Sequence, residues 1–194
     1  FVDLMDEVKD LLRYVFQTEN RLTFPVSGPG SAAMETCFTN MVEAGDKVVI
    51  ARNGVFGGRM TEMATRLSAD VVTIDDEWGQ PVDPQKLEAA LESNPDTKIV
   101  GFVHAETSTG ALSDASKLAE IAQRFGCLTI VDTVTSLTGS PLYVDDWGLD
   151  AVYSGAQKCL SSVAGIAPLT ISDRAVEKIN QRQTPVSTWF HDIG

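Results

Sequence analysis

The sequence has 194 residues, of which 15 are Lys or Arg and 27 are Asp or Glu, giving a net charge of −12 at neutral pH. This acidic balance, with no cluster of basic residues, argues against nucleic acid and against an anionic membrane surface as partners. Hydrophobic residues make up 43% of the chain, which is ordinary for a globular domain with a buried core. No apolar run approaches the roughly 18 residues of a membrane span, so no membrane insertion is predicted.

Cysteine usage favours a reducing compartment. Cys37, Cys127 and Cys159 are odd in number and form no CxxC pair, so a disulfide framework is not expected. We therefore expect a cytoplasmic protein. Organelle targeting stays open, because we expect the sequence to be a fragment of a longer protein. A fragment is expected because the chain opens at Phe1 directly in a helical pattern and stops at Gly194 without a closing element.

Helices and strands are predicted to alternate from one end of the chain to the other. In chain order, the pattern predicts a helix over 2–16, a strand over 22–26, a helix over 32–43, a strand over 47–51, a helix over 57–67, a strand over 70–74, a helix over 83–91, a strand over 98–103, a helix over 113–125, strands over 128–132, 151–154 and 167–171, and a helix over 174–182.

This alternation predicts one α/β domain spanning residues 1–194. Its strands, such as 48–50 and 129–131, are continuous apolar runs, which is typical of strands covered on both faces by crossover helices. We expect a mostly parallel central sheet of about seven strands with helices on both faces. Ligands of such sheets bind beyond the carboxyl ends of the strands, so the residues that follow each strand are the candidates for a site.

The first such segment is a glycine-rich turn between a predicted strand and a predicted helix. It reads Ser27, Gly28, Pro29, Gly30 and Ser31. The N-terminus of a helix offers free N–H groups and a partial positive charge, which suit a phosphate group. The turn is neither a GxGxxG fingerprint nor a Walker P-loop, so a nucleotide-binding module is not supported. A glycine-rich turn that serves packing alone remains an alternative at this point.

Two further strand ends carry an acid and a lysine. Asp132 ends an apolar strand and needs a compensating partner if it is buried. Lys158 follows the strand over 151–154, and a desolvated lysine there could attack a carbonyl group. Taken singly, Asp132 could cap a turn and Lys158 could be a surface lysine. Taken together with the phosphate cradle, they are the set that pyridoxal 5′-phosphate (PLP) requires, with a Schiff base on the lysine and the acid on the pyridine nitrogen.

The chain resembles the class V aminotransferases of PLP fold type I, most closely the alanine–glyoxylate and serine–glyoxylate (serine–pyruvate) group. The resemblance runs in register along essentially the whole chain. It is carried by residues 27–35, 45–48, 53–59, 104–110, 131–137 and 153–158.

The resemblance implies a role for each matching residue. Lys158 would be the Schiff-base lysine and proton shuttle, and Asp132 would pair with the pyridine nitrogen. Phe56 would stack on one face of the ring and Val134 would pack on the other, while Thr107 would bond near the ring hydroxyl. Gly30, Ser31 and Gln157 would contribute to the phosphate site. The cofactor-binding set is therefore Ser27, Gly28, Gly30, Ser31, Phe56, Thr107, Asp132, Val134, Gln157 and Lys158, and no metal site is expected.

The implied reaction is transfer of an amino group from alanine or serine to glyoxylate or pyruvate. Members of the family act as homodimers with shared active sites, so small amino acids, α-keto acids and a second copy are the expected partners. The family also carries a C-terminal small domain, whose arginine binds the substrate carboxylate, and we expect this domain to lie outside the chain. Residues 1–194 would then be the PLP-binding large domain.

Three alternatives stay open. A ureidoglycine–glyoxylate aminotransferase shares the same motifs. A cysteine desulfurase-like lyase is disfavoured, because such enzymes have histidines where this chain has Phe56 and Gln157. A non-catalytic PLP-binding homologue is disfavoured because both Asp132 and Lys158 are present.

Overall fold

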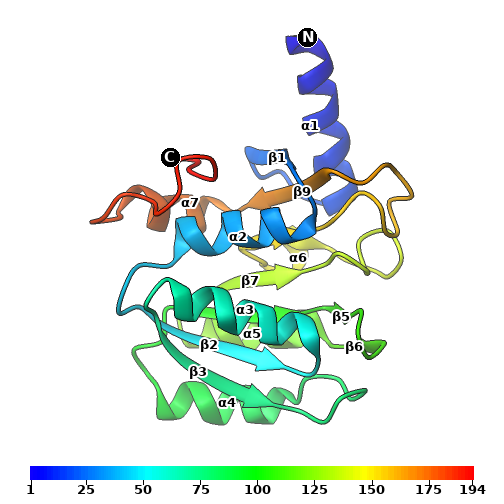
Figure 1. Ribbon diagram of the computed structural model, residues 1–194. Coiled ribbons are helices and arrows are strands. Elements are labelled where there is room, and N and C mark those ends of the chain that lie inside the picture. Colours follow the sequence, from blue (N-terminus) through cyan, green and yellow to red (C-terminus); the bar gives the residue numbers. More distant parts are fainter.

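The computed structural model describes residues 1–194, in which seven helices and nine strands alternate along the chain (Figure 1). In chain order they are α1 (Val2–Phe16), β1 (Leu22–Ser27), α2 (Gly30–Met41), β2 (Lys47–Arg52), α3 (Val55–Arg66), β3 (Asp70–Asp75), α4 (Pro84–Ser93), β4 (Ile99–Val103), β5 (Ala105–Glu106), β6 (Ala111–Leu112), α5 (Ala115–Arg124), β7 (Leu128–Asp132), α6 (Val144–Trp147), β8 (Ala151–Tyr153), β9 (Ile166–Ile171) and α7 (Asp173–Asn180).

A seven-stranded sheet in the order β1-β9-β8-β7-β4-β2-β3 forms the centre of the molecule. The pairs from β8 to β3 are parallel, whereas β9 is antiparallel to both β8 and β1. β9 is therefore the only strand that runs against the others. The expected α/β class and mostly parallel sheet of about seven strands are confirmed. Because β9 runs back in the direction opposite to β8, the loop that joins them lies at the edge of the sheet where the parallel strands end.

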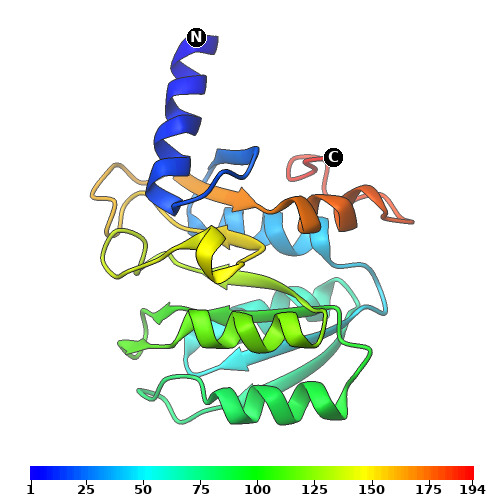
Figure 2. The same cartoon turned by 180° about the vertical axis from the view of Figure 1, so that it is seen from behind.

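Helices cover both faces of the sheet, as predicted. α2, α3 and α7 pack on one face (Figure 1), and α4, α5 and α6 pack on the other (Figure 2). Successive residues of each strand alternate between the two cores. In β2, Val48 and Ile50 pack with the first group, whereas Val49 and Ala51 pack with the second. Both faces of these strands are buried, which explains their uninterrupted apolar runs.

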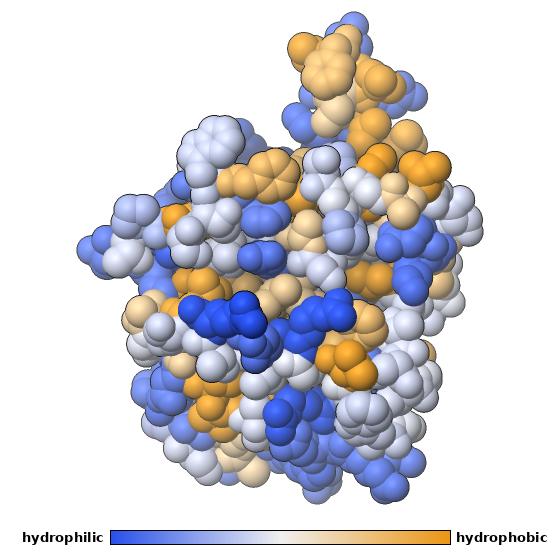
Figure 3. Space-filling view, viewed as in Figure 1, coloured by the Kyte–Doolittle hydropathy of each residue, from blue (hydrophilic) through white to orange (hydrophobic).

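The helix α1 projects away from the body of the molecule beyond the sheet edge formed by β1 and β9 (Figures 1 and 2). Only its last residue, Phe16, is buried. The apolar side chains of its outer part are exposed, and Figure 3 shows them on the protruding end. No helix of the protein is both long enough and apolar enough to cross a bilayer.

The structure differs from the predicted elements in four places. α2 begins at Gly30 and α3 at Val55, each two residues earlier than the sequence pattern predicts. The short hairpin of β5 and β6 and the single-turn helix α6 are not predicted at all. Elements of two to four residues are too short to show the hydrophobic periodicity of a strand or helix, so the sequence pattern does not reveal them.

Candidate functional site

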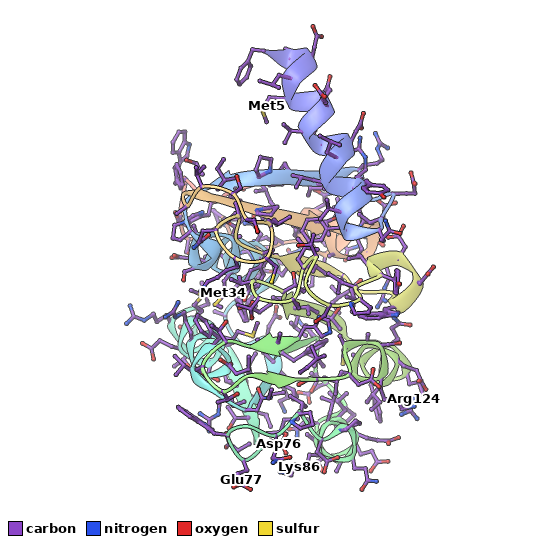
Figure 4. All side chains as sticks on the ribbon, turned by 90° about the vertical axis from the view of Figure 1, so that its right-hand side faces the viewer. Met5, Met34, Asp76, Glu77, Lys86 and Arg124 are labelled. Atoms are coloured by element: carbon purple, nitrogen blue, oxygen red, sulfur yellow. The ribbon has the colours of Figure 1, made fainter.

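A cleft of about 160 Å³ lies at the carboxyl edge of the sheet. Because β1, β2, β7 and β8 run in the same direction, the segments that follow them meet there. The lining residues are Pro29, Gly30, Ser31, Met34, Phe56, Arg59, Asp132, Val134, Gln157 and Lys158. In Figure 4, Met34 lies at about mid-height of the molecule, whereas Asp76 and Lys86, which form an ion pair, lie at its lower end.

The N-terminus of α2 forms one side of the cleft. Pro29 is the N-cap residue with extended backbone, and Gly30 and Ser31 belong to the first turn of the helix. The N–H groups of such a turn have no acceptors within the helix and are available to an anion. A Cβ atom on residue 30 would lie 2.8 Å from Cγ2 of Val134, so only glycine lets the turn approach the opposite wall this closely.

Asp132 lies at the floor of the cleft, at the end of β7. It is only 2% exposed, its Oδ2 accepts a hydrogen bond from the Tyr153 hydroxyl at 2.9 Å, and its Oδ1 accepts one from the Val134 N–H at 2.9 Å. It takes part in no ion pair. Burial raises the pKa of Asp132 to about 6, although these two hydrogen bonds act in the opposite direction. The carboxylate is thus held in one orientation with no cation bonded to it.

Phe56 and Val134 stand on different walls of the cleft. Phe56 lies in the first turn of α3, and Val134 lies two residues beyond the end of β7. Both are half-buried and pack against the core that includes Met34. An aromatic face and an aliphatic group on separate walls leave a slot suited to a flat ring.

Lys158 enters the cleft from the loop between β8 and β9. The base of this loop is tied by hydrogen bonds from the Ala156 N–H to the Ile166 carbonyl at 3.0 Å and from the Ser162 N–H to the Ala156 carbonyl at 2.9 Å. Lys158 and the neighbouring Gln157 line the cleft but are exposed, so the lysine is not in a desolvated position in this structure.

Arg59 is a cleft residue that the sequence analysis did not single out. Its Nη1 donates to Ser31 Oγ at 2.7 Å, and its guanidinium carbon lies 4.8 Å from the centre of the Phe56 ring. The signal available in the sequence was its spacing, because a residue three positions after Phe56 lies on the same face of a helix. Arg59 adds a positive charge next to the N-terminus of α2.

Three of the predicted site residues lie outside the lining of the cleft. Ser27 is the last residue of β1 and pairs with Ile166, while the Gly28 N–H donates to the Gly165 carbonyl at 2.9 Å. The Thr107 hydroxyl is exposed and lies 3.0 Å from the Thr135 hydroxyl. The other seven predicted residues, which are Gly30, Ser31, Phe56, Asp132, Val134, Gln157 and Lys158, come together.

Comparison with known proteins gives consistent matches. The sequence model of the class V aminotransferases matches residues 1–188. Alanine–glyoxylate aminotransferase of Rattus norvegicus is 38% identical over 190 residues, which cover 98% of this chain and 46% of that protein.

Solved structures of two further proteins superpose closely. An alanine–glyoxylate aminotransferase from Nostoc sp. is 49% identical with a TM-score of 0.96, and the match covers 99% of this chain and 51% of that one. A ureidoglycine–glyoxylate aminotransferase from Bacillus subtilis is 36% identical with a TM-score of 0.96 over 99% of this chain and 49% of that one. The chain therefore spans about half the length of the relatives it matches.

Proposed function

The chain belongs to the class V aminotransferase family, and from this premise we propose that it binds PLP and transfers the amino group of alanine or serine to glyoxylate or pyruvate. The observation that carries the proposal is the buried carboxylate of Asp132, which takes part in no ion pair and faces the cleft that Lys158 also lines. A buried carboxylate without a cation is costly unless a ligand supplies the positive charge. A protonated pyridine nitrogen is such a ligand.

The residues of the cleft fit PLP group by group. The N–H groups of Gly30 and Ser31, with Arg59 and Gln157, would bind the phosphate dianion. Phe56 and Val134 would hold the ring between them, and Lys158 would bind the aldehyde carbon. When bound, PLP supplies an electron sink for the carbanion formed from an amino acid.

The proton chemistry would belong to two side chains. Lys158 Nζ would take the proton from the α-carbon of the amino acid and deliver it to the former aldehyde carbon of the cofactor, after which water would release the keto acid. Asp132 would keep the ring nitrogen protonated, and it is suited to this because the Tyr153 hydroxyl and the Val134 N–H fix its two oxygens. Preorganised groups of this kind cost no rearrangement during the reaction.

The amino donor distinguishes the proposed activity from its main alternative. Similarity to the Bacillus subtilis ureidoglycine–glyoxylate aminotransferase favours ureidoglycine as a second candidate donor. Both activities would use the same cleft, and glyoxylate would be the acceptor in each. Parallel assays with alanine, serine and ureidoglycine as donors separate the two.

We also propose that the protein acts as a homodimer in the cytoplasm. The dimer is supported by the exposed apolar side chains along α1, which include Leu4, Leu11 and Tyr14. The reducing compartment is supported by the free state of Cys37 and Cys127, both of which are buried in the core.

The proposal is tested by trapping the cofactor on the full-length protein. The protein is incubated with PLP, reduced with borohydride, digested, and mapped by mass spectrometry. We expect one adduct on Lys158 and none in the Lys158→Ala variant. The exposed Lys117, which forms an ion pair with Glu120 on α5, provides a matched control, because Lys117→Ala should keep the adduct.

An adduct spread over several surface lysines, or none at all on a folded protein, would overturn the proposal and favour a non-catalytic homologue. An adduct on Lys158 without amino transfer from any of the three donors would support PLP as the cofactor and would contradict the proposed substrates.

A further inference from the structure

The N-terminus of α3 is capped by residues that lie about fifty positions further along the chain. Gly54 occupies the N-cap position and has no side chain to offer. The Val55 N–H instead donates to Ser108 Oγ at 2.9 Å, and the Phe56 and Gly57 N–H groups donate to Glu106 Oε2 at 3.1 and 3.3 Å. Three N–H groups that the helix itself leaves without acceptors are thus satisfied from outside.

The second oxygen of Glu106 completes the arrangement. Oε1 accepts hydrogen bonds from the Ser108 N–H at 3.1 Å and from Ser108 Oγ at 2.7 Å. Glu106 is only 1% exposed and forms no ion pair, so its charge is balanced by these donors and by the positive end of α3. We call Glu106 and Ser108 together the cap clamp.

The cap clamp can reach the start of α3 only because residue 54 is glycine. A Cβ atom there would lie 2.4 Å from Glu106 Cγ and 2.5 Å from Ser108 Oγ. Any side chain at this position would displace the carboxylate from the end of the helix. The contact between the cap clamp and α3 therefore depends on the glycine at position 54.

The clamp holds the turn that carries two cleft residues. Phe56 donates its own N–H to Glu106, and Arg59 follows one turn later on the same face. Glu106 lies in β5, which follows β4 after a single residue, so the clamp ties α3 directly to the strand ends of the sheet. The position of the Phe56 ring relative to Asp132 and Val134 depends on this link.

We propose that Glu106 and Ser108 are positioning residues, which hold the Phe56 ring at the distance from Val134 that the cofactor ring requires. Neither residue lines the cleft. The charge of Glu106 contributes to the raised pKa of Asp132, whereas Ser108 carries no charge, so Ser108→Ala tests positioning alone. The cofactor part of this inference rests on the proposed function, whereas the clamp itself does not.

The first test needs no cofactor. Amide hydrogen exchange is measured on the full-length apoprotein and on the Glu106→Gln, Glu106→Ala and Ser108→Ala variants. We expect protection of residues 55–57 to fall by about five- to tenfold in Glu106→Gln and further in Glu106→Ala, with a smaller loss confined to Val55 in Ser108→Ala. Asp83→Ala is the matched control, because Asp83 caps α4 through the Gln85 N–H and should affect that helix alone.

The second test measures PLP binding by the same variants. We expect Glu106→Gln to weaken PLP affinity at least about fivefold and to change the visible circular dichroism of the bound cofactor, since the ring loses its fixed neighbour. Asp83→Ala should leave both unchanged. Ser108→Ala, the mildest variant, keeps the test informative should Glu106→Ala fail to fold.

Unchanged exchange at residues 55–57 in Glu106→Gln and Ser108→Ala would overturn the clamp. Lost protection together with unaltered PLP affinity and circular dichroism would overturn the positioning role. A wild-type protein that binds no PLP would instead overturn the proposed function and with it the cofactor part of this inference, while the exchange result would still decide the clamp.

Discussion

Two buried aspartates at opposite edges of the sheet have opposite environments. Asp46 precedes β2 at the amino edge and is 3% exposed, and its carboxylate accepts from Lys98 Nζ at 2.5 Å and from Lys178 Nζ at 2.9 Å. Burial alone would raise the pKa of Asp46, but the hydrogen bonds from the two lysines, a further one from the Glu43 N–H and the charge of Lys178 together lower the pKa. Asp132 at the carboxyl edge is equally buried and has no such cation, so its pKa is raised.

The two environments indicate different roles, because the Asp46 carboxylate stabilises the fold and the Asp132 carboxylate is available to a ligand. Asp46 joins β2, β4 and α7 through its two lysines, and its charge is neutralised within the chain. Asp132 has only the neutral donors Val134 and Tyr153. A buried charge left without a counter-ion is typical of sites where a ligand completes the pairing.

The largest expected effect comes from removing the charge at the ligand edge. Asp132→Asn should lower the rate of amino transfer at least about 100-fold, because the ring nitrogen would lose the carboxylate that keeps it protonated. The measurement is the steady-state rate with alanine and glyoxylate on the full-length protein. Asp150→Asn is the matched control, since Asp150 is also buried but bonds to Thr129 and Ser172 at the amino edge. A rate within tenfold of wild type would remove Asp132 from the proposed mechanism.

The reverse pattern is expected at the amino edge. Asp46→Asn should lower the free energy of unfolding by about 2 kcal/mol, because two lysines lose a charged partner that is largely buried. Urea unfolding of the apoprotein gives this value. PLP affinity should stay at the wild-type level, and a variant that loses affinity but keeps its stability would contradict the division between the two aspartates.

The pH dependence of stability should carry opposite signs for the two residues. Because the native state of the apoprotein holds a proton on Asp132 up to about pH 6, this group lowers the free energy of unfolding as pH rises from about 4 to 6, by up to about 1.4 kcal/mol per pH unit. The lowered pKa of Asp46 adds stability above the ordinary aspartate pKa, and that stability is lost as pH falls below it.

Difference curves isolate these contributions from other titrations. Subtracting the stability of Asp132→Asn from that of wild type at each pH should give a curve that falls between pH 4 and 6. The same subtraction for Asp46→Asn should give a curve that rises from acid pH. A flat difference for Asp132 would show that its proton affinity is the same in the folded and unfolded states.

The positions of Asp132 and Lys158 could be predicted because parallel strands deliver whatever follows them to one edge. To apply this rule it is enough to know where each strand ends, and the ends of the apolar runs in the sequence indicate these positions. The direction of β9 could not be predicted in the same way, since an apolar strand reads alike in both directions. Its reversal is a property of the β8–β9 loop and of the pairing with β1.

Arg59 and the cap clamp were harder to find for a different reason. Glu106 lies in a segment that the family resemblance included, yet no local pattern says that its carboxylate reaches Phe56 and Gly57. Contacts between residues so far apart depend on how α3 packs on the sheet. The sequence pattern predicts that this helix begins at residue 57, so Gly54 is recognised as an N-cap position without a side chain only once the structure places the start of α3 at Val55.

The pairing of β1 with β9 has a consequence for the order of assembly. Leu22 is opposite Ile171 and Ser27 is opposite Ile166, so this ladder joins the early and late parts of the chain. During synthesis, β1 has to wait for β9 before it can join the sheet, and closing so long a loop is slow. The turn that leads to Gly30 follows β1 directly. The phosphate side of the cleft therefore forms after the parallel strands of the sheet, and a nascent chain gains it only once β9 has been made.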